Sequence, residues 1–428
     1  MKVYSWGRAH PGSSASILKS RQLESKHAQT TLYGNGRSYG DSCLNSVDGV
    51  TVTGARDKFI SFNAMTGLLK CESGILLGTI QRSLVPRGWI LPVSPGTQFV
   101  TVGGAVANDI HGKNHSSMGC LGNHIADLTL SRTDSGETHC SSRDNSALFE
   151  ATIGGLGLTG LITDVSIQMK RVKSSMLEVE NLAFSSLDEF YALSEESTDF
   201  EYAVAWIDGS KPSKKARGIF SRGNHASEQP AAERNIRERT INFPITPPFS
   251  LISPLTMKVF NEAYFQRGKH GPQRSCINYS DFLYPLDKIT NWNRVYGRRG
   301  FMQYQLVIPE CNAMPAITEI INEIYAAKAG SVLSVLKTFG DRRSPGLLSF
   351  PMAGTTLAMD FPNRGNETLK LFEKLDHIVS LAKGRLYPAK DSRMSAKMFH
   401  EGYPNTDRFQ NFRDPYLTSD FAKRIFEE

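Results

Sequence analysis

The chain of 428 residues has no long hydrophobic run and only six cysteines. No apolar stretch approaches the roughly 20 residues that a membrane-spanning helix needs, and the start, MKVYSWGRAHPGSS, has no apolar segment typical of a signal peptide. The cysteines show neither a CxxC pair nor zinc-ligand spacing, which predicts reduced thiols. We therefore expect neither an integral membrane protein nor a disulfide-rich domain, but a protein that is cytoplasmic or peripheral at a membrane.

An excess of acidic residues is also missing. Lys and Arg number 49 against 42 Asp and Glu, which gives a net charge of +7 and a pI near 9.0. This balance suits an anionic partner such as a phosphorylated ligand, an anionic membrane face or nucleic acid. No basic motif is interleaved with aromatic residues, so we expect no nucleic-acid partner.

Glycine and other small residues are concentrated in two separated segments. They are residues 34–41, GNGRSYGD, and residues 89–114, WILPVSPGTQFVTVGGAVANDIHGKN. Because these segments have few bulky side chains, their backbone N–H groups can approach a ligand closely, and phosphate is the ligand that such amides attract. The Lys-Ser/Thr ending of a P-loop is missing, so we interpret the segments as two loops that clasp a pyrophosphate.

Two other motifs are too weak to predict a dinucleotide-binding site or a metal site. Residues 155–160, GLGLTG, match G-x-G-x-x-G, but a β-rich run follows where a dinucleotide-binding fold requires a helix. His111 and His115 are four residues apart, but Gly112 between them disfavours a helix and no carboxylate completes the set. We predict no metal site.

Apolar periodicity predicts an α+β protein of two domains. Residues 223–275 are rich in Pro, Arg and Lys, and we favour a long surface loop there over a lid that contacts a membrane or a lipid tail.

Helices are expected at residues 13–25, 75–84, 316–327 and 416–426, and strands at 49–53, 59–62, 68–71, 125–130, 148–153, 161–169, 202–207, 301–308 and 331–337.

The order of the motifs resembles the FAD-linked oxidases of the vanillyl-alcohol-oxidase type, and within them the oxidases of polyprenyl-phosphoryl ribose. Besides the two loops and GGLGLTG, the similar segments are FMQYQLVIP at residues 301–309 and GRLYPAKDSR at 384–393. The resemblance extends over nearly the whole chain. It implies a discontinuous FAD-binding domain, residues 1–173 and 384–428, and a substrate domain built on an antiparallel sheet, residues 174–383.

The resemblance also implies a reaction. Bound FAD would oxidise the 2′-hydroxyl of a polyprenyl-phosphoryl-D-ribose to the 2′-keto sugar, the first half of an epimerisation to the arabinose donor of the cell envelope. A short-chain NADH-dependent reductase would be the partner that completes it. Two alternatives stay open: a soluble alditol or aldonolactone oxidase of the same superfamily, and a non-enzymatic protein that binds an anionic ligand.

The FAD site is expected in the two loops and in the segments that follow them. Covalent members of the superfamily have a histidine at the position of Arg37, and because arginine cannot form that bond we predict non-covalent FAD. The residues assigned to FAD are Gly34, Asn35, Gly36, Arg37, Ser38, Tyr39, Gly40, Asp41, Gly96, Thr97, Thr101, Val102, Gly103, Gly104, Asn108, Asp109, Ile110, His111, Ile162, Tyr387 and Ala389.

Lys390 and His111 are the candidates for catalysis, because a buried amine or imidazole beside the flavin could accept the hydroxyl proton. The period of two puts Gln303 and Gln305 on one face of their strand, and Lys337 would point a positive charge inward, toward a substrate phosphate. Ala358 and Thr356 stand where members of the resembled family have a cysteine and an asparagine. The residues assigned to substrate are Tyr39, Lys113, Trp206, Tyr284, Gln303, Gln305, Lys337 and Lys390.

Overall fold

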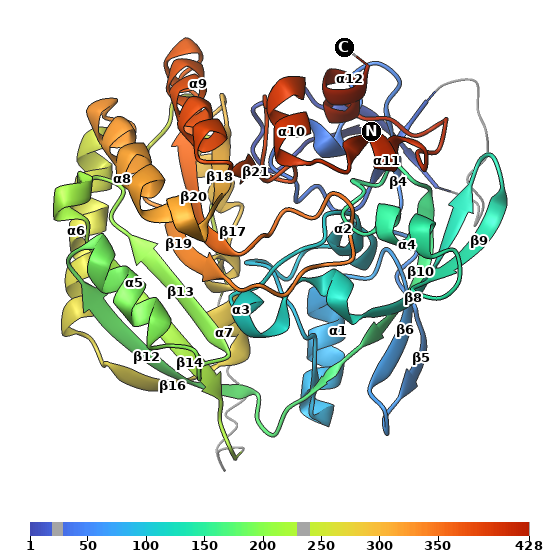
Figure 1. Ribbon diagram of the computed structural model, residues 1–428, viewed down its shortest axis with the longest axis horizontal. Coiled ribbons are helices and arrows are strands. Elements are labelled where there is room, and N and C mark those ends of the chain that lie inside the picture. Colours follow the sequence, from blue (N-terminus) through green and yellow to red (C-terminus); the bar gives the residue numbers. More distant parts are fainter. Residues whose placement is uncertain (19–28, 229–239, 428) are drawn as a thin grey trace.

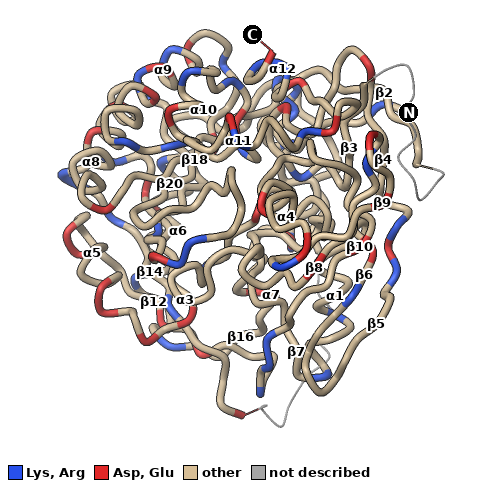
Figure 2. The backbone as a smooth tube through the Cα atoms, turned by 45° about the vertical axis from the view of Figure 1, so that its right-hand side comes forward, with Lys and Arg blue, Asp and Glu red and all other residues tan. Residues whose placement is uncertain are grey.

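The computed structural model describes residues 1–18, 29–228 and 240–427 (Figure 1). Its helices and sheets follow one another along the chain, and the α+β class is confirmed. None of the helices in these ranges combines the length and the apolar character that crossing a bilayer requires. All six cysteines are free thiols. The charged residues of the outer helix α8 (Glu310–Ala326) are all acidic, and those of α9 (Asn366–Leu381) are of both signs, so the net positive charge is not gathered there (Figure 2).

A small sheet at the N-terminus has four strands in the order β1-β2-β4-β3. They are β1 (Lys2–Val3), β2 (Ser13–Ile17), β3 (Thr31–Tyr33) and β4 (Val50–Val52). The helix predicted at residues 13–25 is wrong over Ser13–Ile17, which pair in parallel with β4; residues 19–28 lie outside the described ranges. The serine-rich start has weak helix propensity of its own, so pairing with a neighbouring strand decides its conformation.

A second sheet follows, in the order β5-β6-β10-β8-β9. The helices α1 (Leu77–Leu84) and α2 (Val102–Ala107) supply side chains to its core. The strand predicted at residues 148–153 is wrong, because α4 (Ser146–Thr152) forms there and buries Phe149. Short apolar runs do not distinguish a buried strand from a buried helix. The strands are β5 (Phe59–Asn63), β6 (Leu68–Glu72), β8 (Ile125–Arg132), β9 (Gly136–Ser141) and β10 (Leu161–Gln168).

The largest sheet has eight strands in the order β16-β12-β14-β13-β19-β20-β18-β21. The helices α5 (Leu187–Glu195), α8 and α9 pack against one face of it (Figure 1). The other face is turned toward the two glycine loops. The strands are β12 (Met176–Phe184), β13 (Tyr202–Ile207), β14 (Gly218–His225), β16 (Arg274–Asn278), β18 (Phe301–Pro309), β19 (Ser334–Phe339), β20 (Gly354–Pro362) and β21 (Arg385–Leu386).

The edge strand β21 comes from the returning C-terminal segment. Leu386 pairs with Leu306 of β18, so the chain extends this sheet beyond residue 383, where we placed the end of the substrate domain. The predicted domain boundaries stay predictions.

The segment at residues 223–275 contains regular structure where we expected a loop. Residues 229–239 lie outside the described ranges, but α6 (Pro254–His270) is a helix of 17 residues. Ser253 caps it, since its Oγ accepts a hydrogen bond of 3.2 Å from the Thr256 amide, and Pro254 occupies the first helical position, which proline favours. The loop prediction is therefore wrong for this part.

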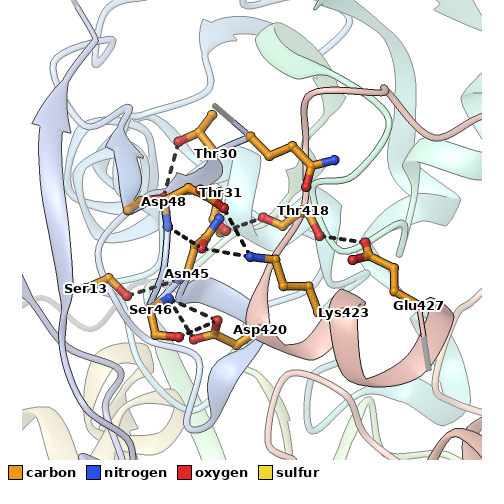
Figure 3. Close-up of polar contacts among 12 residues, drawn as sticks. Ser13, Thr30, Thr31, Asn45, Ser46, Asp48, Thr418, Asp420, Lys423 and Glu427 are labelled. Carbon is orange, nitrogen blue, oxygen red and sulfur yellow. Dashed lines mark hydrogen bonds and ion pairs between the residues drawn. The ribbon is translucent and has the colours of Figure 1, made fainter. Parts of the chain in front are cut away.

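The C-terminal segment closes on the first sheet (Figure 3). Thr30 donates to the Tyr416 carbonyl at 2.9 Å and accepts from the Thr418 amide at 3.0 Å, while the Ser46 amide donates to Asp420 at 3.0 Å. The last helix, α12 (Asp420–Phe426), begins four residues later than predicted, behind the cap Ser419. The strand that leads into the first glycine loop is thus held by the other end of the chain.

Candidate active site

The two glycine loops lie directly against each other. A Cβ placed on Gly34 would be 2.4 Å from Thr101 Oγ1, so only glycine allows this approach. Asn35 Nδ2 donates to the Phe99 carbonyl across the same contact at 2.8 Å. The structure therefore brings together two segments that are about 60 positions apart in the sequence.

The amides of the two loops differ in what they can still bind. In the described chain no acceptor faces the amides of residues 35–38 or of residues 96–97, and a Cβ on Gly96 would meet no atom within 4 Å. By contrast, the Gly103 amide donates to the Ser73 carbonyl at 2.7 Å and the Gly104 amide to Thr101 Oγ1 at 3.2 Å. N–H groups that have no acceptor in the protein can donate to the oxygens of a bound anion, so the cradle fits a pyrophosphate. Our assignment of the Gly103 and Gly104 amides to it is corrected.

Arg37 occupies the first loop between two aromatic rings. Its guanidinium carbon is 4.2 Å from the centre of the Trp6 ring and 5.2 Å from that of Phe99. Burial lowers the pKa of Arg37. No histidine is present in this loop, and non-covalent FAD stays a prediction.

His111 lies at the centre of the face where the loops meet the eight-stranded sheet. Lys337 Nζ of β19 is 2.9 Å from His111 Nδ1 and donates to the Gly112 carbonyl at 2.9 Å. Gln305 Nε2 of β18 is 3.1 Å from His111 Nε2. Burial and the Lys337 charge lower the pKa of His111 well below its ordinary value, so the imidazole is neutral.

Lys337 and Lys390 lie close to this histidine, and Lys113, whose Nζ donates to the Phe282 carbonyl, lies close enough to Lys337 for its charge to act on it. Lys337 is buried, with 8% of its surface exposed, and Lys113 and Lys390 are half-buried. Burial lowers the pKa of Lys337 to about 7 and that of Lys113 to about 8. Lys390 Nζ lies 3.7 Å from the centre of the Tyr39 ring, and burial lowers its pKa as well. Clustered amines with lowered pKa values are typical of a site that receives an anion or moves a proton.

Asp360 is a site residue to which we assigned no role from the sequence. It lies opposite Gln303 in the pairing of β18 with β20, and Gln303 Nε2 donates to its carboxylate at 2.5 Å. Burial raises the pKa of Asp360, while the Lys390 charge lowers it. Side chains alternate between the two faces of a strand, so within residues 355–360, TTLAMD, Asp360 lies on the same face as Thr356 and Ala358. This alternation could have indicated from the sequence that Asp360 shares a face with them, which the pairing of β20 with β18 makes the face of Gln303 and Gln305.

Tyr387 and Ala389 join the returning segment to the cofactor loops. The Tyr387 hydroxyl donates to the Asn108 carbonyl at 2.9 Å, and its ring stacks on Phe350 with the ring centres 4.6 Å apart. The Ala389 carbonyl accepts from the Tyr39 amide at 2.9 Å. Both lie between His111 and the first loop, and their assignment to FAD stays a prediction.

Several assigned residues face away from this cluster. The Tyr284 hydroxyl donates to Ser94 Oγ at 3.1 Å inside a separate core, so its assignment to the pocket wall is corrected. Asp41 pairs with Arg424 at 2.8 Å, and Asp109 accepts from the Gly122 amide at 2.8 Å and from Ser349. These two carboxylates support the loops from behind instead of facing a ligand. Val102, Ile110 and Ile162 belong to the core of the second sheet.

The structure gives the second histidine of the H-x-x-x-H pair a packing role. The ring of His115 lies 4.4 Å from that of Phe339, and burial lowers its pKa to about 3. Across the described ranges, no three His, Cys, Asp or Glu side chains are grouped as metal ligands would be. Trp206, assigned to substrate, packs at 4.6 Å on Tyr264 of α6.

Comparison with known proteins identifies the group to which this site belongs. Residues 9–142 match the FAD binding domain family. The chain is 33% identical over 453 aligned positions to the decaprenylphosphoryl-beta-D-ribose oxidase of Mycolicibacterium smegmatis, with 99% of this chain and 97% of that protein covered. The chain belongs to the family of that oxidase. FAD is accordingly its cofactor, and it is an FAD-dependent oxidoreductase that acts on CH–OH groups.

Other relatives resemble this member of the oxidase family over a shorter length. The D-lactate dehydrogenase of Anaerostipes hadrus is 26% identical over 36% of the chain and 33% of its own length. The L-gulonolactone oxidase of Mus musculus is 27% identical over 33% of the chain and 32% of its own length. The predicted FAD dependence and enzyme class are confirmed, and the alternative of a non-enzymatic binding protein is wrong.

Proposed function

We propose that the protein oxidises the 2′-hydroxyl of a polyprenyl-phosphoryl-D-ribose to the 2′-keto sugar. The observation that carries the proposal is the group of Lys337 and Lys390 near the neutral His111, with Lys113 close to Lys337 and the buried carboxylate of Asp360 close to Lys390. Buried positive charge is costly without a counter-charge. A phosphate on the substrate would provide that charge, whereas an alditol or a lactone would not.

The amides of the first loop would hold the cofactor. Residues 35–38 offer unpaired N–H groups, and Gly96 and Thr97 offer more from the second loop. Together they would neutralise the pyrophosphate of FAD by hydrogen bonds from the main chain. Bound FAD supplies the acceptor for the hydride on C2′.

Lys390 would take the proton of the reacting hydroxyl. Its lowered pKa leaves part of the amine neutral near physiological pH, and Tyr39 holds the nitrogen over its ring. Gln303 and Asp360 would orient the sugar beside it, because both present polar atoms on the same face of β18 and β20. His111 would fix Lys337, which is the nearest partner for the phosphate.

Flavin bleaching under anaerobic conditions tests the proposal. We expect a farnesyl-phosphoryl-β-D-ribose to reduce the bound flavin, and xylitol and L-gulono-1,4-lactone to leave it oxidised. Lys337→Met should lose at least tenfold in kcat/KM for the phosphorylated sugar, because a charge-assisted hydrogen bond contributes roughly 1.5–3 kcal/mol. Bleaching by the alditol or the lactone alone would show that the alternative oxidase activity is the correct one.

The product implies a second enzyme. A 2′-keto sugar must be reduced from the opposite face to give the arabinose configuration, so we propose a short-chain NADH-dependent reductase as the partner and the arabinose donor as the end product. Adding such a reductase and NADH to the oxidised product should yield the arabinose epimer, identified by sugar analysis. Recovery of ribose alone would contradict this order of steps.

A further inference from the structure

The segment that leads into α6, together with the outer side of α6, carries a group of exposed apolar side chains. Leu255 is 72% exposed, Phe249 69% and Val259 63%, and Ile245 is 71% exposed a few residues earlier. We call these four residues the outer apolar face. Soluble proteins expose large apolar side chains singly, and clusters of them mark sites of interaction.

The helix α6 is apolar on two sides. Met257, Asn261 and Phe265 are buried against the sheet, one turn apart from each other, whereas Leu255 and Val259 are one turn apart on an exposed side. A surface helix needs only one apolar side, here that of Met257 and Phe265, to pack on its own protein. The second side has no packing partner in the described chain.

The charges near this face are mainly positive. The exposed basic side chains of α6 are those of Lys258, Arg267 and Lys269, and the helix has one acidic residue, Glu262, which Arg217 neutralises at a distance of 2.7 Å. Exposed apolar side chains accompanied by basic ones that form no ion pair with the described residues fit the interface of a bilayer that contains anionic lipid. They do not fit an acidic-rimmed protein groove.

An apolar row leads to the active site from Tyr264, which lies on the sheet-facing side of α6, across the helix from Leu255 and Val259. The Tyr264 ring of α6 packs on Trp206, and Trp206 lies beside Val335 in the pairing of β13 with β19. Val335 is paired with Ala358, and Ala358 with Gln305, so all four share one face of the sheet. The row ends at the amide that faces His111.

We propose that the outer apolar face docks on a lipid bilayer containing anionic lipid. The proposal rests on the proposed function, because a polyprenyl-phosphoryl sugar resides in a bilayer and must reach the lysines from there. The row from Tyr264 to Ala358 then receives the prenyl chain while the sugar lies at Gln305.

Vesicle co-sedimentation of the FAD-loaded protein tests this inference. We expect binding to vesicles of phosphatidylcholine with phosphatidylglycerol, and weaker binding to phosphatidylcholine alone. L255S/V259S should bind the anionic vesicles roughly tenfold or more weakly, since each buried CH₂ lost reduces bilayer affinity. The matched control is Leu381→Ser, a 69% exposed leucine at the end of α9, which should bind as the wild type does.

Two outcomes would overturn docking: equal vesicle binding by L255S/V259S and wild type, or no vesicle binding by a wild-type protein that instead self-associates through this face in analytical ultracentrifugation. A water-soluble, short-chain prenyl-phosphoryl ribose separates the docking from the proposed function. It should bleach the flavin of L255S/V259S at the wild-type rate. Vesicle binding without any bleaching would refute the proposed reaction and leave the docking intact.

Discussion

Lys390 is the residue that we propose as the acceptor of the hydroxyl proton. It lies beside Tyr39 and the buried Asp360, in a segment that also contacts the first loop. We expect Lys390→Ala to bind FAD normally but to lose flavin reduction by at least a hundredfold, because general-base catalysis contributes roughly 10²–10⁴-fold. Stopped-flow absorbance measures it.

The control for this prediction is Lys397→Ala, whose side chain is 85% exposed on α10 (Ala396–Gly402). It should reduce its flavin at the wild-type rate. A Lys390→Ala enzyme that is reduced nearly as fast as wild type would remove Lys390 from the reaction.

The pH dependence of substrate binding should report the protonation of Lys337 and Lys113. Their pKa values, about 7 for Lys337 and about 8 for Lys113, lie below the ordinary value because burial disfavours the charged form. Raising the pH through 7 to 8 therefore removes positive charge from the free enzyme, and a phosphorylated 2′-deoxy analogue, which cannot be oxidised, should bind more weakly over this range. The same analogue without its phosphate serves as the control, and its Kd should not change. A Kd for the phosphorylated analogue that is the same at pH 6.5 and pH 8.5 would contradict the assignment.

Arg37 predicts how the flavin is held. Since arginine cannot form the bond that a histidine makes with the flavin methyl group, acid or heat denaturation should release all of the FAD into the supernatant. Mass spectrometry of the denatured chain checks this. A polypeptide whose mass is increased by that of the flavin would show that another side chain makes the attachment.

At the scale of elements, the C-terminal helix α12 supports the cofactor loop. Arg424 pairs with the buried carboxylates of Asp41, in the first loop, and Asp391, beside Lys390, at 2.8 and 3.2 Å. We expect Arg424→Met to lower the free energy of unfolding by about 3 kcal/mol, because it leaves two buried carboxylates without a counter-charge. Urea titration of the FAD-loaded protein measures it.

A surface pair provides the comparison for this prediction. Arg408 pairs with Glu150 at 2.7 Å, but its side chain is 52% exposed, so Arg408→Met should cost less than about 1 kcal/mol. Equal losses for the two variants would mean that burial of the Asp41 pair does not matter.

The elements also show how far the sequence determines the fold. Strands with clear alternation, such as β13 and β18, are confirmed, and so is the helix α8, although it begins six residues earlier than predicted. The errors fall on Ser13–Ile17 and on residues 148–153, where local preference is weak and neighbouring strands or the core decide. In the site, the resemblance pointed to the loops and the lysines. Asp360, Tyr284 and the paired glycine amides depend on strand register and tertiary contacts, which local patterns do not contain.

At the scale of the whole molecule, FAD should contribute to stability. Amides of the two loops have no acceptor within the described chain and exist in this arrangement only when the chain is folded, so FAD should bind the folded chain and not the unfolded one. At a free concentration of 100 times Kd, FAD should stabilise the fold by about 2.7 kcal/mol. The apoprotein should therefore melt at a lower temperature in calorimetry and recover on addition of FAD.

FMN is the control for this measurement, because it lacks the pyrophosphate and should raise the melting temperature much less. A melting temperature that FAD does not change would contradict the proposed cradle.

The returning segment has a consequence for how such enzymes diverge. The Tyr387 amide donates to the Gln305 carbonyl at 3.0 Å, and the Ala389 carbonyl accepts from the Tyr39 amide at 2.9 Å, so main-chain atoms on both sides hold the stretch that carries Lys390. Main-chain bonds persist when side chains are exchanged. Side chains of the lining such as Ala358 and Thr356 can therefore differ between relatives without moving the main chain that carries the Lys390 amine.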